Sequence, residues 1–306
     1  MEPAHVNLAC MPSAALLATI ERNRKRVWGL CYRMTGSRSD ADDLAQEAIA
    51  RAIEREAQVV RDESLDGWLF RIATTVSLDH LRRRRGARRP SELVDPVEGI
   101  EAASPDPESA LILREDIRFA VVVALQRLPP RQRGALLLHH VFDRPLAEIA
   151  DALGTNANTV KALLARARGT LARARRHTDV DVPVDRAVVD RLVHAIETRS
   201  VEAFTALLAE DVWGVTDGGG VIRVAAKPVF GIRVVARGFA SVNRRQPLAV
   251  AAHVRVLNGE PAVVVTLPAA GGAVFASVHV ETRAGRIVAL RVVRDPRKLA
   301  HLEVTR

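Results

Sequence analysis

The spacing of apolar residues changes near residue 179, and this change constrains the fold more than any other feature of the chain. Before it, apolar residues recur every three or four positions over residues 14–84 and 109–174, which is typical of packed helices. After it, two short helical stretches, at residues 184–196 and 201–208, lead into valine-rich runs. The sequence therefore predicts all-α domains followed by an α+β domain.

The valine-rich runs are separated by residue pairs that favour tight turns, namely Asn258-Gly259, Gly271-Gly272 and Ala284-Gly285. Because the connections are so short, consecutive runs should pair as an antiparallel meander packed by the helices. The expected strands lie at residues 248–257, 260–267, 273–282 and 286–293.

Composition excludes several classes of protein. The 306 residues suffice for two or three domains, and 45 basic against 36 acidic residues give a net charge of +9. Only two cysteines occur, which excludes a disulfide scaffold and a four-cysteine zinc site and favours a reducing compartment. No apolar run approaches the roughly 20 residues that cross a bilayer. We therefore expect a cytoplasmic protein without membrane contact, metal or cofactor.

Charge is arranged in blocks along the helical part. Six arginines fall within residues 82–89, and residues 155–177 carry six basic side chains and no acid. Between these blocks, residues 91–116 hold eight acids, one arginine and several prolines. Such blocks contact partners of opposite charge, so the pattern predicts two basic bodies joined by an extended acidic linker.

Residues 146–171 have the pattern of a helix-turn-helix. Ala150 is small enough for two helices to cross, Gly154 suits the turn, and Val160 and Leu163 would pack the second helix against the first. Asn156 would cap the second helix. An ordinary helical hairpin with a solvated basic face is the alternative interpretation.

The second helix of this motif would present its polar side chains to DNA. Lys161, Arg166 and Arg168 suit phosphates and base edges, and no acid opposes them. The candidate DNA-binding residues of this segment are Asn156, Asn158, Thr159, Lys161, Arg166 and Arg168.

Three stretches together resemble an extracytoplasmic-function sigma factor of the sigma-70 family: residues 32–52 (YRMTGSRSDADDLAQEAIARA), 67–85 (GWLFRIATTVSLDHLRRRR) and 128–168. The resemblance implies four parts: sigma region 2 at residues 1–90, an acidic linker at 91–112, sigma region 4 at 113–177, and an extension at 178–306. It also implies that the chain binds core RNA polymerase and promoter DNA. Region 2 would then melt and read the minus-ten element, and region 4 would recognise the minus-thirty-five element.

The resemblance also assigns surfaces within region 2. Polymerase contact falls on Asp40, Asp42, Asp43, Gln46 and Glu47. For Asp40 and Asp42, the alternative is that these charges only favour the helix N-terminus. Contact with the opened minus-ten strand falls on a base-capturing loop at residues 61–67 and on Arg71, Thr75, Arg82, Arg83, Arg84 and Arg85. Trp68 either stacks a base or belongs to the core.

The extension resembles the SnoaL-like, nuclear-transport-factor-like cone that is fused to one group of these sigma factors. In that group the cone contacts the sigma domains as a built-in regulator. The matching residues are Asp217, Gly218, Gly219 and Gly220, with Asp295, Pro296, Lys298 and Leu299 near the end. For the glycine run, a plain flexible turn is the alternative.

Two other functions stay open at this stage. Asp211, His253 and His279 could meet in a pocket of the cone as a catalytic group, although lone polar residues on a sheet are more often structural. We expect no enzyme and assign no catalytic residue. A small-molecule ligand in the cone also stays open. The second overall hypothesis is a ligand-sensing helix-turn-helix regulator that acts without being a sigma subunit.

Overall fold

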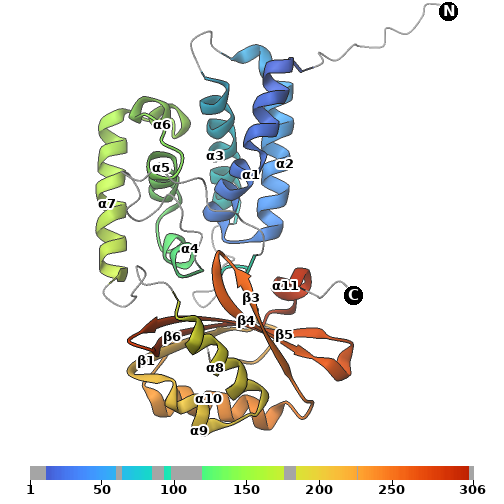
Figure 1. Cartoon of the computed structure of the whole chain (residues 1–306). Coiled ribbons are helices and arrows are strands. Elements are labelled where there is room, and N and C mark those ends of the chain that lie inside the picture. Colours follow the sequence, from blue (N-terminus) through green and yellow to red (C-terminus); the bar gives the residue numbers. More distant parts are fainter. Residues whose placement is uncertain are drawn as a thin grey trace, which may run out of the picture.

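The computed structural model describes residues 12–59, 64–84, 93–97, 119–175, 184–225 and 227–302. Two helical bodies stand side by side on one face of a curved sheet, and further helices cover the opposite face (Figure 1). None of the described helices combines the length and apolar character needed to span a membrane. The predicted combination of all-α bodies with an α+β domain is confirmed.

The first helical body is an antiparallel bundle of α1 (Ala14–Thr35), α2 (Arg38–Glu54) and α3 (Leu65–Arg83), with a short 3₁₀ turn at Glu56–Gln58. Each long helix begins at a serine whose hydroxyl accepts a backbone N–H, namely Ser13, Ser37 and Ser64. Trp68 is only 3% exposed, so it belongs to the core, and the base-stacking interpretation is wrong.

The second body contains α4 (Phe119–Gln126), α5 (Pro130–His140), α6 (Leu146–Ala152) and α7 (Ala157–Arg175). The predicted helix-turn-helix is α6 and α7. Gly154 adopts φ +56° in the turn, and the Asn156 side chain accepts the Thr159 N–H at 2.9 Å, so both predictions for this turn are confirmed. Val160, on the inner side of α7, is fully buried.

The two bodies pack closely against each other. The Phe70 and Phe142 ring centroids lie 4.6 Å apart, and Arg26 lies over both rings. Gln126 Nε2 donates to the Arg33 carbonyl at 3.0 Å, and the buried Arg133 donates to the Met34 carbonyl. One continuous hydrophobic core therefore runs through both bodies.

The third domain is a cone built on a six-stranded sheet. Helices α8 (Arg186–Glu197) and α9 (Val201–Ala206) come first, then β1 (Leu208–Asp217), β2 (Val229–Phe230) and α10 (Ile232–Arg245). Strands β3 (Ala251–Leu257), β4 (Glu260–Leu267), β5 (Ala273–Arg283) and β6 (Arg286–Val293) follow, with a 3₁₀ turn at Pro268–Ala270. The chain continues through α11 (Pro296–Leu299) and a 3₁₀ turn at Ala300–Leu302.

The sheet order is β2-β1-β6-β5-β4-β3. The antiparallel meander β3 to β6 is confirmed, but β1 pairs in parallel with β6, which the sequence reasoning missed. The strands β1 and β2 and helix α10 were not predicted either. Turn pairs set the direction only of strands that they join, whereas β1 and β6 are joined by no hairpin.

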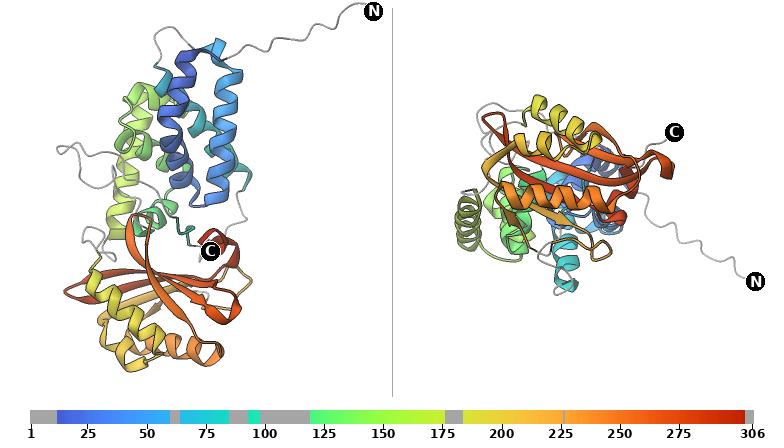
Figure 2. Two further views of the ribbon diagram at one scale, coloured as in Figure 1. Left: turned by 45° about the vertical axis from the view of Figure 1, so that its right-hand side comes forward. Right: turned by 90° about the horizontal axis from the view of Figure 1, so that it is seen from below.

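The two faces of the sheet have different neighbours. Helices α8, α9 and α10 cover the concave face, as the view from below in Figure 2 makes clear. The opposite face packs against the helical bodies through Leu257, Ala262, Val264 and Val293. The middle of β4 is therefore buried on both faces, which explains its run of consecutive valines.

Candidate functional site

Helix α7 presents an open basic face. Lys161, Arg166 and Arg168 are exposed, whereas Leu164 and Ala167, between them in the sequence, are buried against the rest of the body. Arg168 Nη2 lies 3.4 Å from His140 Nε2. No acid of the described residues pairs with Lys161 or Arg166, so both cations are free to meet phosphates.

The polar residues at the start of α7 differ in their exposure and in their hydrogen bonds. Asn158 is exposed and Thr159 half-buried. Asn156 is exposed, but its side-chain oxygen accepts both the Thr159 N–H and, at 3.1 Å, the Thr159 hydroxyl. Asn156 is therefore first of all the cap of α7, and only its amide N–H groups could reach a base or phosphate.

On α3, the residues predicted to meet the minus-ten strand are aligned along one helix. Arg71 is half-buried, and Thr75 is exposed with its hydroxyl donating to the Arg71 carbonyl at 2.9 Å. Arg82 pairs with Asp79 at 3.0 Å, and Arg83 and Arg84 are exposed. Arg85 and residues 61–63 of the predicted loop lie outside the described residues.

On α2, the predicted polymerase-binding residues fall into two groups. Asp40 binds Arg84 and lies 3.5 Å from His80, Asp42 accepts the Trp28 indole N–H at 2.6 Å, and Glu47 pairs with Arg51 at 2.5 Å. Asp43 and Gln46 are exposed. Asp40 therefore touches the predicted DNA-binding cluster through Arg84, a contact that the sequence did not indicate.

The two predicted regulatory segments come together at one end of the sheet. Asp217 ends β1, and Asp295 caps α11 just after β6. The Arg294 N–H donates to the Asp217 carbonyl at 2.7 Å, which extends the pairing of β1 with β6. The glycine run folds onto Asp295, because a Cβ added at Gly219 would overlap the Asp295 carboxyl.

Hydrogen bonds hold the glycine loop in place. The Gly219 N–H donates to Asp217 Oδ1 at 2.8 Å, and Arg297 Nη2 donates to the Gly219 carbonyl at 2.8 Å. Burial opposes ionisation of the Asp295 carboxyl, yet hydrogen bonds from Arg297, together with the charges of Arg297 and Lys298, lower its pKa below the ordinary value. The loop is thus a built contact rather than a plain turn.

Lys298 connects these segments to residues 93–97, which we call the strap. Its Nζ lies 3.0 Å from Asp217 Oδ2 and donates to the Leu93 carbonyl. The Leu93 N–H in turn donates to Asp217 Oδ2 at 2.8 Å. We refer to Asp217, Asp295 and Lys298 with the glycine loop as the latch. Pro296 is the first residue of α11, and Leu299, the last residue of the same helix, is buried.

The strap also binds the first helical body. The Tyr32 hydroxyl donates to the Asp95 carbonyl at 2.6 Å, and the Asp95 N–H donates to the Gly36 carbonyl at 2.9 Å. The Asp95 carboxylate accepts the Arg38 N–H at 2.7 Å, at the start of α2, and lies 3.8 Å from Lys298 Nζ. All five strap residues are buried, so this part of the linker is not a solvated tether.

Asn258 was predicted only as a turn residue, and it proves central to the same junction. Its backbone N–H donates to the Val97 carbonyl at 2.7 Å, and its side-chain oxygen accepts the Val97 N–H at 3.2 Å. Its amide nitrogen donates to the Tyr32 hydroxyl at 2.8 Å. Asn258 thus joins the cone, the strap and α1, and its complete burial and these side-chain hydrogen bonds distinguish it from an exposed hairpin asparagine.

The two helical bodies match two known sequence profiles. Sigma-70 region 2 matches residues 19–87, and Sigma-70 region 4 matches residues 118–177. The chain is also 33% identical over 294 residues to the ECF RNA polymerase sigma factor SigJ of Mycobacterium tuberculosis, and the match covers 92% of both chains. The chain belongs to the ECF sigma factors of the sigma-70 family.

Other relatives extend the comparison. SigG of Mycobacterium tuberculosis is 39% identical over 224 residues, a match that covers 64% of this ECF factor but only 60% of the length of SigG. The crystal structure of SigJ from Mycobacterium tuberculosis superposes with a TM-score of 0.69 at 27% identity, covering 93% of this chain and 98% of SigJ. The likeness to SigJ thus includes the cone.

The three residues considered for catalysis do not meet in this ECF factor. Asp211 is exposed and pairs with Arg283 at 2.5 Å, and His253 is exposed on β3. His279 is buried on β5, where its Nε2 lies 3.3 Å from the Ser277 hydroxyl. Alternation along β5 turns Val278 toward the concave face and His279 away from it, so this catalytic reading is wrong.

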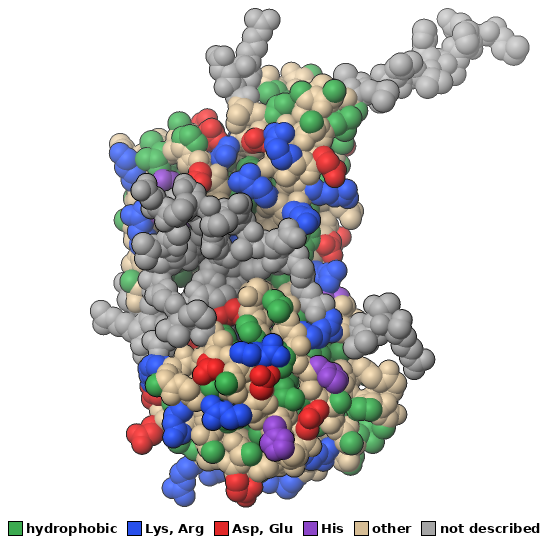
Figure 3. Space-filling model, viewed as in Figure 1, with side chains coloured by type: hydrophobic (Ala, Val, Ile, Leu, Met, Phe, Trp, Pro, Cys, Tyr) green, Lys and Arg blue, Asp and Glu red, His purple; other side chains and the backbone are tan. Residues whose placement is uncertain are grey.

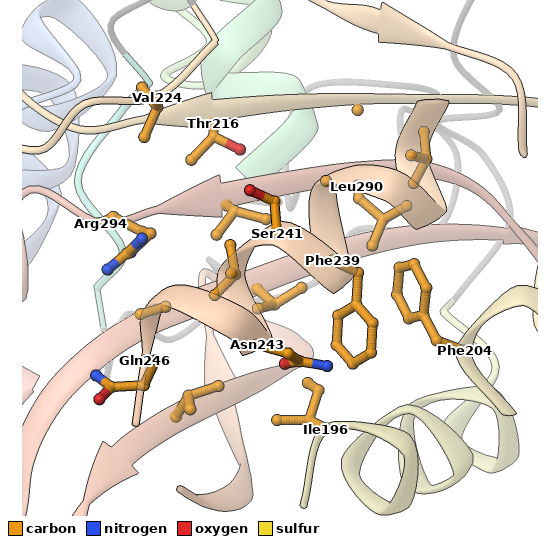
Figure 4. A pocket seen from close by; sticks show the side chains of 18 of the residues that line it. Ile196, Phe204, Thr216, Val224, Phe239, Ser241, Asn243, Gln246, Leu290 and Arg294 are labelled. Carbon is orange, nitrogen blue, oxygen red and sulfur yellow. The ribbon is translucent and has the colours of Figure 1, made fainter. Parts of the chain in front are cut away.

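The concave face of the cone holds a cavity of about 420 Å³ between the sheet and α10. Its walls are mostly apolar, and Arg294, just after β6, and Thr216, near the end of β1, line it (Figure 4). In the chain, Arg294 directly precedes the latch residue Asp295, and Thr216 directly precedes Asp217. None of Asp211, His253 and His279 lines it. On the face seen in Figure 3, basic and acidic side chains are mixed over the outer surface of the cone. This surface differs from the basic face of α7, which has no acidic residue.

Proposed function

We propose that this chain is a sigma subunit that directs core RNA polymerase to specific promoters and initiates transcription. The observation that carries the proposal is the full-length relationship to SigJ together with the matches to sigma regions 2 and 4 on the two helical bodies. The chain would carry no active site of its own, because the polymerase supplies the chemistry, and it would work in the cytoplasm. Family membership argues against a helix-turn-helix regulator that acts without polymerase.

Within this function, we assign one task to each surface. The basic face of α7 would bind the minus-thirty-five element, since its exposed cations suit phosphates and base edges. The exposed polar side of α3 would meet the opened minus-ten strand. Asp43 and Gln46, exposed on α2, would make the outermost contacts with the polymerase.

The cone would regulate the sigma domains from within the same chain, and a small molecule in its cavity would be the signal. Two features support this proposal. The latch and Asn258 hold the strap, which is part of the linker between regions 2 and 4. The sigma bodies themselves pack together through Arg133 and Gln126, so the two DNA-reading helices are held in one arrangement.

Run-off transcription with purified core polymerase tests the proposal. Full-length chain should support transcripts of defined length from its promoters, whereas a conventional helix-turn-helix regulator would give none. A chain without residues 178–306 should initiate at a different level from the full-length chain. Equal output from both chains would reject the regulatory role of the cone, and no output from either would reject the sigma function.

A further inference from the structure

The cavity of the cone has a strongly biased lining. Branched aliphatic and aromatic side chains make up most of its walls, and the described residues that line it include four arginines but no aspartate or glutamate. Its volume of about 420 Å³ falls within the roughly 300–1,000 Å³ that is usual for small-molecule sites. The walls of the cavity are therefore mostly apolar, and the charged side chains among the described residues that line it are all positive.

Arg294 is the cation best placed to meet a ligand. Its guanidinium lies over the Phe275 ring, 4.0 Å from the centroid, and no carboxylate of the described residues pairs with it. Its Nε is buried without a hydrogen-bond partner among those residues. A buried, unsatisfied donor on a charged group is costly, and an anionic oxygen beside it would remove that cost.

The other three arginines are less available or more distant from the interior. Arg199 donates to the backbone carbonyls of Gln246 and Leu248, so its guanidinium already holds the chain between α10 and β3. Arg223 and Arg245 are exposed. They would attract an anion toward the mouth of the cavity and leave Arg294 to bind it inside.

Burial also acts on Arg294 directly. It lowers the pKa of the guanidinium from its ordinary value, because the charged form loses water contact. Arginine nevertheless keeps its charge in proteins. The site thus holds a partly desolvated cation, for which a carboxylate is the natural partner.

The opposite side of the cavity is aromatic. Phe204 and Phe239 stack with ring centroids 4.2 Å apart and an interplanar angle of 12°. Figure 4 shows these rings and Ile196 at one side, with Arg294 at the other. An occupant that satisfies both sides needs an apolar body and a single anionic head.

We propose that the cone binds an apolar monocarboxylate, with its carboxylate on Arg294 and its apolar body against Phe204 and Phe239. The inference rests on the proposed sensing role of the cone for its biological meaning, but binding is measured without transcription. It also gives the signal a route. Arg294 and Thr216 line the cavity, and each precedes a latch residue, Asp295 or Asp217, in the chain.

Calorimetric titration of the full chain with decanoate, and with 1-decanol as its uncharged counterpart, tests the proposal. The wild type should bind decanoate at least tenfold more tightly than decanol. Arg294→Gln should weaken decanoate binding at least tenfold and leave decanol binding nearly unchanged. Arg237→Gln, on the same domain at an exposed site of α10 away from the cavity, should change neither.

A second variant places the ligand in the cavity and does not depend on Arg294. Gly238 lines the cavity at an exposed position, and a Cβ added there has no atom within 4 Å, so Gly238→Leu should fold and narrow the mouth of the cavity. It should weaken both decanoate and decanol. A melting curve for each variant identifies any loss of folding. If Arg294→Gln does not fold, Arg294→Lys, which keeps the charge, replaces it, and its affinity for decanoate should be intermediate.

Several outcomes would overturn the inference. These are equal affinity for acid and alcohol, full decanoate binding by Arg294→Gln, an unchanged affinity in Gly238→Leu, or no binding of either probe at millimolar concentration. Run-off transcription keeps the two proposals separate. Failure to bind decanoate with normal initiation rejects only the ligand, whereas normal binding without initiation rejects only the sigma function.

Discussion

The basic face of α7 and the latch of the cone use charge in opposite ways. Lys161 and Arg166 are exposed and have no acidic partner among the described residues, so their charge remains available to another molecule. Lys298 and Asp217 are largely buried. They form an ion pair with each other, and both also hydrogen-bond to the backbone of the strap. Replacing the exposed cations should therefore weaken binding to another molecule without lowering the stability of the fold. Replacing one member of the buried pair should lower the stability without directly changing that binding.

The largest expected effect tests how tightly the latch is built. Gly219→Ala should lower the free energy of unfolding of the cone by about 3–4 kcal/mol, because a Cβ both strains a residue at positive φ and overlaps Asp295. Gly271→Ala is the matched control, with positive φ and open space around the Cβ, and should lose only about 1–2 kcal/mol. Equal losses in urea denaturation would contradict a packed loop.

The next effect concerns the buried charges. Lys298→Met removes the cation that faces Asp217, and leaving that carboxylate buried and unpaired should destabilise the cone and strap junction by about 3 kcal/mol. Lys227→Met, at an exposed lysine of the same domain, should change stability by less than about 0.5 kcal/mol. Urea denaturation of both variants measures the difference, and similar midpoints would mean that the latch is no stronger than a surface contact.

The exposed cations should behave differently. Lys161→Glu combined with Arg166→Glu should weaken promoter binding by roughly 30-fold or more and lower the salt dependence of binding, since each phosphate contact adds about 0.9 to that slope. The melting temperature should stay nearly constant. Arg233→Glu combined with Arg237→Glu on α10, at two exposed arginines, makes the same change in net charge and is the control. Filter binding at several salt concentrations decides, and an equal loss in the control would reject a specific role for α7.

The last effect is absent at neutral pH and compares two histidines of one sheet. Burial, with the nearby Arg291 charge, lowers the pKa of His279 to about 3 from 6.5. The unfolded chain takes up a proton below pH 6.5 and the folded chain does not, so stability is full above pH 6.5 and falls by up to about 1.4 kcal/mol per pH unit toward pH 3.

His279→Gln should remove this contribution to the pH dependence of unfolding, and His253→Gln, at an exposed histidine, should leave it in place. Denaturation curves at pH 7, 6, 5 and 4 provide the measurement. The same slope in both variants would show that His279 is accessible to protons in the folded chain.

Much of the helical half could be predicted because its signals are local. Gly154 and Asn156 act within one turn of the chain, and the basic side chains of α7 need only the helical period to share a face. The hairpin pairs of the cone are equally local. Helix α10 was missed although Ile232, Val235, Phe239 and Val242 recur at helical spacing, a signal that could have found it.

The sites of the cone were less predictable because their parts are distant in sequence. Asp217 and Lys298 were both named as regulatory, but nothing in their neighbourhoods indicated that one ammonium group would bridge Asp217 and the strap. Asn258 and Tyr32 are 226 positions apart and share a buried hydrogen bond. Asp211, His253 and His279 were considered together, and strand alternation separates them.

By itself, the sequence determined the helical segments of the first two bodies, the strands of the meander, the turns between those strands and the basic face of α7, because these properties depend on residues within a few positions of one another. Only the tertiary structure decided which charges are buried, which strand pairs in parallel, and which residues line the cavity of the cone. Burial and pairing depend on surfaces that meet across the whole chain, and a side chain such as Arg294 becomes a candidate ligand contact only when its surroundings are apolar.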